Sequence, residues 1–466
     1  MTTLRLLFNH EHTSLAPNTY EADSSAATVI LKLACPSLVR FDHEMVLRPD
    51  LALSWEVSAD HRVYTFELRP GLKFHNGRVL DAEAVAACFR RMMDPRVITP
   101  QQADYAGLES ITATGPTRVT FTFARPCIPF LANLAWRTYV CDDTAVQPVG
   151  AGPYEVTAWI AGDHVALKKF VGYHEVDRYA ADDIIIRWAP QAAQRIAAIE
   201  AGAVDIVETV PQTMAAALAA RGLIETLGVN SPRKTVIAFR HSVAPFDDPR
   251  MRAAVAHALD RDALRREFLG DRGRRVDGVL PDDDPWSVPL TPLPYDPERA
   301  RALVVEAGYG EGVRVKVATT AMPPVPGVAA RVAEALTAIG IHLDLRSYSD
   351  PPWWPSVYLQ GDWQMAFQGA SARPHPHILF QRDLVTGGAF NPGKYSSAEL
   401  DAVLTKARET PDAEAGPLYA EAQRIVHRDI AVLPMYASDV LAGVRPGVRG
   451  FRPHPLGYIE LADVTL

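Results

Sequence analysis

The sequence has no long apolar run and no excess of positive charge. Its longest apolar candidate, residues 432–441, is interrupted by Pro434, Ser438 and Asp439, whereas a membrane-spanning helix needs about 20 continuous apolar residues. The 47 Lys and Arg residues are outnumbered by 55 Asp and Glu residues, which gives a net charge of −8. Such a balance provides no general attraction for nucleic acid or anionic lipid. We therefore expect a chain that does not span a membrane and does not bind nucleic acid.

Cysteine is scarce, and the four cysteines (Cys35, Cys88, Cys127 and Cys141) include no CxxC pair. This spacing excludes zinc-ribbon and thioredoxin-like sites. A bridge between Cys127 and Cys141 would suit an oxidising compartment, but the spacing alone leaves its formation open. Residues 1–8 hold too short an apolar stretch for a secretory signal. We expect either an extracytoplasmic protein whose signal has been removed or a protein that stays in the cytoplasm.

Complete enzyme motifs are also missing. The GAGP sequence at 150–153 lacks the later glycine of a dinucleotide loop, and no GxxxxGK[ST] occurs. In GASAR at 369–373, Arg373 replaces the last glycine that a GxSxG nucleophile elbow requires. The acidic run at 282–284 lacks the glycine and the distant glutamate of a calcium loop, and is more typical of a solvated turn. We therefore expect no enzymatic activity and no resident cofactor.

Hydrophobic periodicity predicts both strands and helices. Residues 63–68 and 119–123 alternate between apolar and polar side chains, as half-buried strands do. Between them, Asp81 can cap a helix. Its apolar residues follow the helical i, i+3, i+4, i+7 spacing, namely Val85, Cys88, Phe89 and Met92. This part of the chain therefore predicts a compact α+β unit.

The second half of the chain predicts further helices and strands. Helices are expected to begin at Asp248-Pro249 and Asp296-Pro297, since aspartate caps a helix and proline suits its first position. Gly308 is expected to end the second of them. The apolar segments 184–188, 313–318 and 341–345 predict strands, the last two flanking a helix at 327–339, with proline-rich loops at 281–297 and 323–326. With about two to three domains expected from the length, the fold class is mixed α/β.

Six segments in order along the chain carry a resemblance to a known family. They are LALSWEVSADHRVYTFELRPGLKFHNGRVLDAEAV at 51–85, PVGAGPYEV at 148–156, AAIEAGAVDIVETVP at 197–211, PFDDPRMRAAVAHALDRDAL at 245–264, DPERARALVVEAGY at 296–309 and KYSSAELDAVLTKA at 394–407. The chain thereby resembles the extracytoplasmic solute-binding proteins of ABC importers, in the peptide- and nickel-binding family (family 5). The similarity extends over nearly the whole length.

The resemblance implies a two-lobed, periplasmic-binding-protein-like fold that closes over a ligand by hinge motion. Lobe I would combine residues 1–38, 150–240 and 440–466, with an extra subdomain, 39–149, inserted in it. Lobe II would comprise residues 241–439, and the hinge crossings would lie near 240 and 440.

The segment QGASARPHPHILF, at 368–380, bears on the ligand. Peptide-binding relatives usually have an aspartate before a proline here, which holds the peptide's ammonium group. No acidic residue occurs between Trp363 and Asp383 in this chain, and Arg373 would repel an ammonium. The resemblance to nickel-chelate relatives, in which an arginine of the first region holds a carboxylate, makes Arg137 and Arg373 candidate carboxylate-binding residues.

The same segment contains His375 and His377 in a stretch that proline biases toward extended backbone, so their imidazoles are expected to project from a stiffened loop. Neutral imidazole binds nickel, copper and zinc. By similarity to the nickel-binding branch, the segments holding His10 and His12, His375 and His377, and His454 approach one cleft. Among 14 histidines, pairs that are two residues apart in the sequence also arise by chance. Likewise, Arg137 and Arg373 would serve equally as ion-pair residues, and Trp136 would suit either a cleft wall or a core.

We therefore predict the substrate-binding component of an ABC importer. The preferred cargo is a nickel or other transition-metal ion held by a small carboxylate chelator, such as histidine or a metallophore. The alternatives are a di- or oligopeptide or small organic anion, or a cytoplasmic ligand sensor of the same fold. The expected partners are the solute and an ABC permease, and we expect a monomer in the periplasm.

Overall fold

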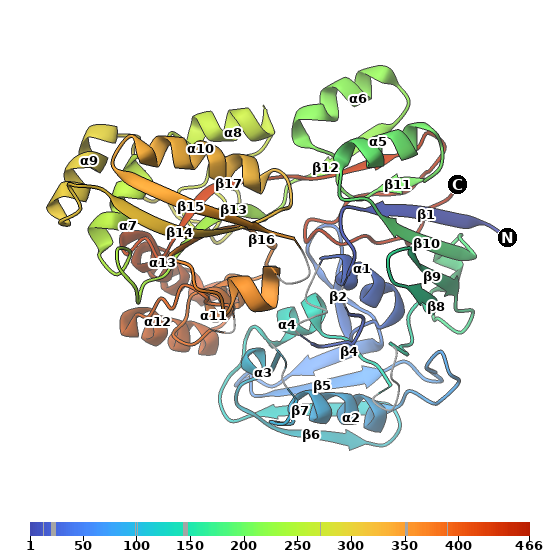
Figure 1. The fold of residues 1–466 in the computed structure, drawn as a ribbon. Helices are drawn as coiled ribbons and strands as arrows, with labels where there is room; N and C mark the ends of the chain where they lie inside the picture. Colours follow the sequence, from blue (N-terminus) through green and yellow to red (C-terminus); the bar gives the residue numbers. More distant parts are fainter. Residues whose placement is uncertain are drawn as a thin grey trace. The chain divides into compact units, whose positions relative to one another are not determined.

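The computed structural model describes residues 1–12, 14–19, 25–97, 99, 101–142, 148–270, 272–349, 353–388 and 390–466. The chain forms two compact units, residues 1–229 with 440–466 (unit 1) and residues 230–439 (unit 2) (Figure 1). It therefore passes from one unit to the other twice. Within the described ranges, every helix is too short or too polar to cross a membrane.

Unit 1 is built on a seven-stranded sheet with the order β12-β18-β11-β1-β10-β9-β8. The N-terminal strand β1 pairs in parallel with both β10 and β11, while the C-terminal strand β18 pairs antiparallel with β11 and β12. Both ends of the chain therefore contribute to one sheet. The strands are β1 (Thr3–Phe8), β8 (Tyr154–Ile160), β9 (His164–Lys169), β10 (Asp183–Trp188), β11 (Ile206–Val207), β12 (Glu225–Val229) and β18 (Val440–Val444).

A second, antiparallel sheet of unit 1 has the order β4-β5-β7-β6, and α2 packs on it (Figure 1). The predicted alternation is confirmed, because Tyr64, Phe66 and Leu68 of β5 are all buried. Asp81 caps α2 as predicted, since its carboxylate accepts a 2.9 Å hydrogen bond from Ala84 N. The bounds are β4 (Ala52–Val57), β5 (Val63–Leu68), β6 (Leu108–Thr114), β7 (Arg118–Phe123) and α2 (Ala82–Met92).

The remaining elements of unit 1 lie between these strands along the chain. A two-stranded ribbon of β2 and β3 precedes the second sheet, and α1 contacts β8 of the first. The bounds are α1 (Ser25–Ala34), β2 (Val39–Phe41), β3 (Leu47–Pro49), α3 (Gln101–Asp104), α4 (Phe130–Arg137), η1 (Val176–Arg178), α5 (Ala192–Glu200), η2 (Gln212–Met214) and α6 (Ala215–Arg221).

Two glycines let a loop lie directly against the end of α1. A Cβ atom at Gly150 would lie 2.0 Å from the carbonyl oxygen of Ala34, and one at Gly152 would lie 2.2 Å from that of Leu33. Gly152 N also donates a 2.9 Å hydrogen bond to Ala34 O, and Gly150 O accepts one of 2.8 Å from His75 N. The two glycines of the PVGAGP sequence therefore allow backbone to pack directly against backbone.

Unit 2 contains a five-stranded sheet with the order β15-β14-β16-β13-β17. Strands β14 and β15 are parallel and are joined by α10, so the predicted strand-helix-strand unit is confirmed. The helix begins at Val325, two residues earlier than predicted, because proline at 326 fits its first turn. The strands are β13 (Lys234–Phe239), β14 (Val313–Thr320), β15 (Ile341–Tyr348), β16 (Met365–Ala370) and β17 (Val432–Ala437).

Helices α8 and α10 lie along one face of this sheet (Figure 1), and α11, α12 and α13 form a second apolar cluster. The predicted caps are confirmed: Asp248 accepts from Arg250 N at 2.8 Å, and Asp296 from Arg299 N at 2.9 Å. The bounds are α7 (Pro249–His257), α8 (Arg261–Leu269), α9 (Pro297–Glu306), α10 (Val325–Thr337), η3 (Trp353–Tyr358), α11 (Pro376–Asp383), α12 (Ala398–Glu409) and α13 (Asp412–Arg428).

Candidate ligand-binding site

Arg373 follows β16 and is held by an ion pair. Its Nη2 lies 3.0 Å and 3.4 Å from the two carboxylate oxygens of Asp383, the last residue of α11. The Arg373 side chain is buried. The acid that compensates this arginine therefore comes from its own unit, ten residues farther along the chain.

Lys234 is a second buried cation of unit 2, and the sequence patterns did not single it out. The residue begins β13 and is only 5% exposed. Among the described residues, its Nζ makes one polar contact, a long hydrogen bond of 3.5 Å to Pro232 O. Burial lowers the pKa of Lys234 to about 8, although Asp383 and Asp284 partly oppose this effect. The one signal that could have found it is its position at the start of a mainly apolar strand, KTVIAF.

His375 and His377 lie beside each other in unit 2. His375 is the N-cap of α11: its Nδ1 accepts from His377 N at 3.1 Å, and its Nε2 lies 3.1 Å from Asp412 Oδ1. Both rings pack against Tyr419. The extended backbone predicted at His375 is confirmed, but the predicted projecting loop is wrong, because the helix starts at Pro376 and buries both imidazoles. Burial places the pKa of His377 well below its usual value.

Trp136 and Arg137 end α4 in unit 1. The guanidinium carbon of Arg137 lies 4.9 Å from the centroid of the Trp136 ring, a distance typical of a cation–π contact. Both side chains are buried, and Gln101 Nε2 donates a 2.9 Å hydrogen bond to the carbonyl of Arg137. Arg137 is therefore a buried residue and not a surface residue.

His10 and His12 follow β1. His10 Nδ1 contacts the side-chain oxygen of Asn9. The His12 ring is buried, and its centroid lies 4.6 Å from that of Trp159 and 6.0 Å from that of Trp188. Burial, assisted by His10, lowers the pKa of His12 to about 4. Within the described ranges, His12 Nε2 has no hydrogen-bond partner.

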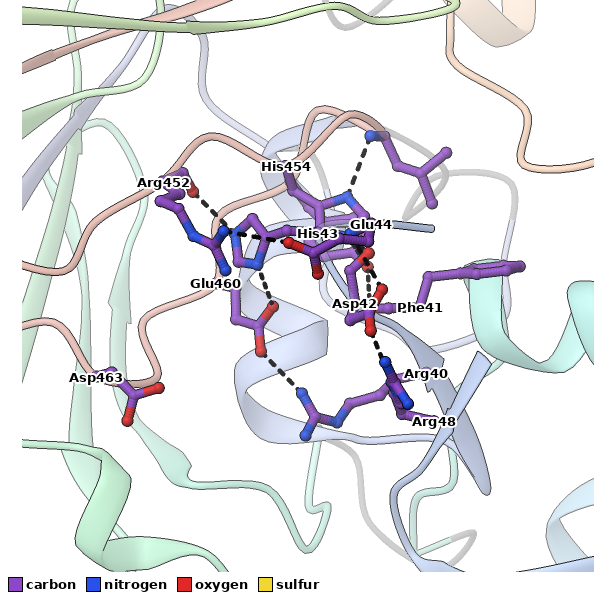
Figure 2. A network of polar contacts seen from close by, with 12 residues as sticks. Arg40, Phe41, Asp42, His43, Glu44, Arg48, Arg452, His454, Glu460 and Asp463 are labelled. Carbon is purple, nitrogen blue, oxygen red and sulfur yellow. Dashed lines mark hydrogen bonds and ion pairs between the residues drawn. The ribbon is translucent and has the colours of Figure 1, made fainter. Parts of the chain in front are cut away.

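His454 belongs to a different polar network, in the C-terminal segment of unit 1. Its side chain is 0% exposed; Nδ1 accepts from Leu456 N at 3.1 Å, and Nε2 lies 3.0 Å from both Asp42 O and the Tyr458 hydroxyl. Figure 2 shows its neighbour His43, whose ring centroid is 5.3 Å away. Burial and, less strongly, His43 lower the pKa of His454 to about 3.

The lowered pKa of His454 predicts that the protein loses stability in acid. Below pH 6.5 the unfolded chain protonates His454, whereas the folded chain does not until about pH 3, so the stabilisation present above pH 6.5 is lost as the pH falls. We expect this residue alone to lower the free energy of unfolding by about 2 to 3 kcal/mol between pH 6.5 and 4.5. Urea unfolding at both pH values measures the change.

The matched variant is His454→Asn. Asparagine does not titrate, and its Oδ1 can accept from Leu456 N as in an Asx-turn. We expect the variant to be less stable than the wild type at pH 7. Its free energy of unfolding should decrease less than that of the wild type on acidification. An equal acid-induced loss in both proteins would contradict the assigned role of His454.

The five candidate histidines therefore occupy three different surroundings within their units. His375 and His377 share one, His12 and its neighbour His10 a second, and His454 a third. In the part of the chain that the structure describes, no group of three or more His, Cys, Asp or Glu side chains is placed to hold a metal ion. Neither unit thus offers a metal site of its own among the described residues.

Comparison with known proteins gives a family match over most of the chain. The model of the bacterial extracellular solute-binding proteins, family 5 (middle part), matches residues 46–391. The glutathione-binding protein GsiB of Escherichia coli is 28% identical over 492 residues, which cover 97% of this chain and 92% of that protein.

Solved structures show the same fold. The periplasmic binding protein DppA of Helicobacter pylori, in complex with the peptide STSA, has a TM-score of 0.91 at 23% identity and covers 100% of this chain and 98% of its own. NikA of Staphylococcus aureus, in complex with Ni(L-His)2, has a TM-score of 0.91 at 18% identity and covers 100% of both chains. These similarities confirm the predicted two-lobed, mixed α/β fold.

Proposed function

Since the chain belongs to the bacterial extracellular solute-binding proteins of family 5, we propose that it captures a small solute outside the cytoplasm and delivers it to the permease of an ABC importer. It performs no bond chemistry in this role. The two chain crossings, at 229–230 and 439–440, serve as the hinge, and closure about it traps the solute. The solute-free protein is a monomer.

The recognised feature of the solute is a carboxylate group. The observation that carries this proposal is Lys234, a buried ammonium whose only polar contact among the described residues is 3.5 Å long. A buried charge without a close partner is unfavourable, and an anionic ligand would remove that penalty. Arg373, whose ion-pair partner Asp383 also acts on Lys234, is the second proposed cationic contact in this region. In unit 1, Arg137 on the face of Trp136 is the proposed contact for another anionic group.

The first candidate is glutathione or a similar small peptide. Glutathione carries two carboxylates and one ammonium, so it suits cationic contacts better than a peptide held mainly by its ammonium. The 28% identity with a glutathione-binding protein along 97% of the chain supports this choice. The absence of an acidic residue between Trp363 and Asp383 fits a site that selects carboxylates.

The second candidate is a nickel ion held by a carboxylate chelator such as histidine. The adjacent imidazoles of His375 and His377 favour it, and His10, His12 and His454 are the other proposed ligands. Because no described group of three side chains could hold the metal, the chelator would have to supply most of the coordination. Binding would then depend on the same carboxylate contacts.

Isothermal titration calorimetry separates these candidates. We expect wild-type protein to bind glutathione with a saturable heat, and nickel chloride without a chelator to give none, since the described residues offer no complete metal site. Saturable binding of nickel with L-histidine, without binding of glutathione, would replace the first candidate by the second. Absence of heat with glutathione, a dipeptide and nickel-histidine would contradict both.

His375→Asn is the variant that tests the imidazole. Asparagine is a good N-cap and can still accept from His377 N, so α11 is retained while the nitrogen ligand is lost. If the solute is glutathione, its affinity should change less than about threefold, since no imidazole contact is required. A selective loss of nickel-histidine binding would identify His375 as a metal ligand.

A further inference from the structure

Three of the four cysteines, Cys35, Cys88 and Cys141, lie near one another in unit 1. The pair considered from spacing along the chain was a different one, Cys127 and Cys141. All four are thiols in the structure. Cys88, on the buried face of α2, lies with its Sγ 4.0 Å from the Sγ of Cys141. Cys35 directly follows α1, and burial together with the neighbouring Cys88 raises the pKa of its thiol. Cys127 lies against Tyr64 instead, accepting a 2.8 Å hydrogen bond from that hydroxyl through its carbonyl.

Backbone contacts hold the chain on both sides of Cys141. Val140 N donates to Pro36 O at 3.0 Å, and Asp142 N donates to Val149 O at 2.8 Å. The Cys88 thiol donates to the carbonyl of Tyr139 at 3.5 Å. The fold therefore keeps the two sulfurs next to each other, and a disulfide requires their separation to shorten from 4.0 Å to about 2.05 Å.

We propose that Cys88 and Cys141 form a disulfide when the chain folds in an oxidising compartment. The oxidant is the disulfide of an oxidoreductase or a small-molecule disulfide such as oxidised glutathione. One cysteine attacks the donor as a thiolate, which releases one donor thiol and leaves a mixed disulfide. The second cysteine then forms the Sγ–Sγ bond and expels the other donor sulfur. The two cysteine protons end on the donor, which is reduced by two electrons.

The surroundings of Cys141 also affect the reactivity of its thiol. The contact with Cys88 and burial raise the pKa of the Cys141 thiol well above its ordinary value, and a thiol rather than a thiolate is a poor nucleophile. The bond would join two thiols that the fold already holds side by side, with their sulfurs 4.0 Å apart. Once formed, it fixes the chain four residues after Arg137.

The test is disulfide mapping of the full chain, refolded in a buffer of reduced and oxidised glutathione, alkylated and digested. The expected product links the Cys88 and Cys141 peptides and leaves Cys35 and Cys127 alkylated. Four alkylated cysteines, or a link through Cys35 or Cys127 in their place, would overturn the proposal. Because mapping uses the wild-type protein, it shows whether the Cys88–Cys141 bond forms even if a variant fails to fold.

Thermal unfolding gives a second readout. A bond closing the loop from 88 to 141 should raise the melting temperature of the oxidised protein above that of the reduced protein by about 4 to 8 °C. Cys141→Ser should abolish this difference, and the matched control Cys127→Ser should keep it. A difference that survives Cys141→Ser, or one that Cys127→Ser removes, would contradict the proposed bond.

Discussion

Gly150→Ala is expected to lower the free energy of unfolding by about 3 to 5 kcal/mol. The added Cβ would meet the carbonyl oxygen of Ala34 at 2.0 Å and the Cα atom of Cys35 at 2.6 Å. Both are backbone atoms, so no side-chain rotation relieves the overlap, and the loop has to move away from α1. That movement also breaks the hydrogen bond from Gly152 N to Ala34 O. The midpoint of urea unfolding measures the effect.

The matched control is Gly369→Ala. Gly369 is an exposed residue of β16 with an ordinary backbone conformation, and a Cβ there would meet nothing within 4 Å. We expect its free energy of unfolding to stay within about 0.5 kcal/mol of the wild type. If both variants lose the same stability, the loss at 150 reflects the general effect of replacing glycine and not the contact with α1.

Lys234→Met is expected to have opposite effects on stability and on binding. Methionine has a similar shape and no charge, so removing a buried ammonium whose pKa is lowered to about 8 should raise the free energy of unfolding at pH 7. We expect a gain of about 1 to 3 kcal/mol. Removing a buried cation that pairs with a ligand carboxylate should weaken binding at least about 30-fold. Urea unfolding and calorimetry with glutathione measure the two effects.

Lys316→Met provides the comparison for this variant. Lys316 lies in the same unit but is exposed, and its Nζ forms a 2.6 Å ion pair with Asp362. A surface pair of this kind contributes about 0 to 1 kcal/mol, so neither stability nor affinity should change much. A Lys234→Met protein that is less stable and binds glutathione normally would show that the ammonium is a structural group, and would remove the main support for carboxylate recognition.

Local patterns predicted the secondary structure well because the signals act between near neighbours. The alternation at 63–68 is a strand with its apolar face buried, and Asp81, Asp248 and Asp296 each cap a helix through backbone hydrogen bonds within three residues. The imidazoles of His375 and His377 were misjudged. The backbone at His375 is extended as predicted, but a helix begins at Pro376 and both rings are buried in place of projecting from a loop.

The candidate site was only partly accessible to sequence reasoning. Arg373 was found by its position in a recognisable segment, but its partner Asp383 comes from the far end of the following helix. Lys234 was missed, since a lysine is usually solvated and only its burial in the tertiary structure makes it unusual. The sequence also did not reveal which cysteines are adjacent. Cys141 lies beside Cys88, 53 residues away, and spacing along the chain carries no information on such a contact.

The sequence by itself determined the family, the mixed α/β class, and the positions of caps and strands, because motif order and residue periodicity are properties of the chain read in one direction. The tertiary structure alone decided which charges are buried, which thiols are adjacent and why 150 must be glycine. Those properties depend on solvent exclusion and on atomic contacts between segments far apart in the chain, and no local pattern encodes either one.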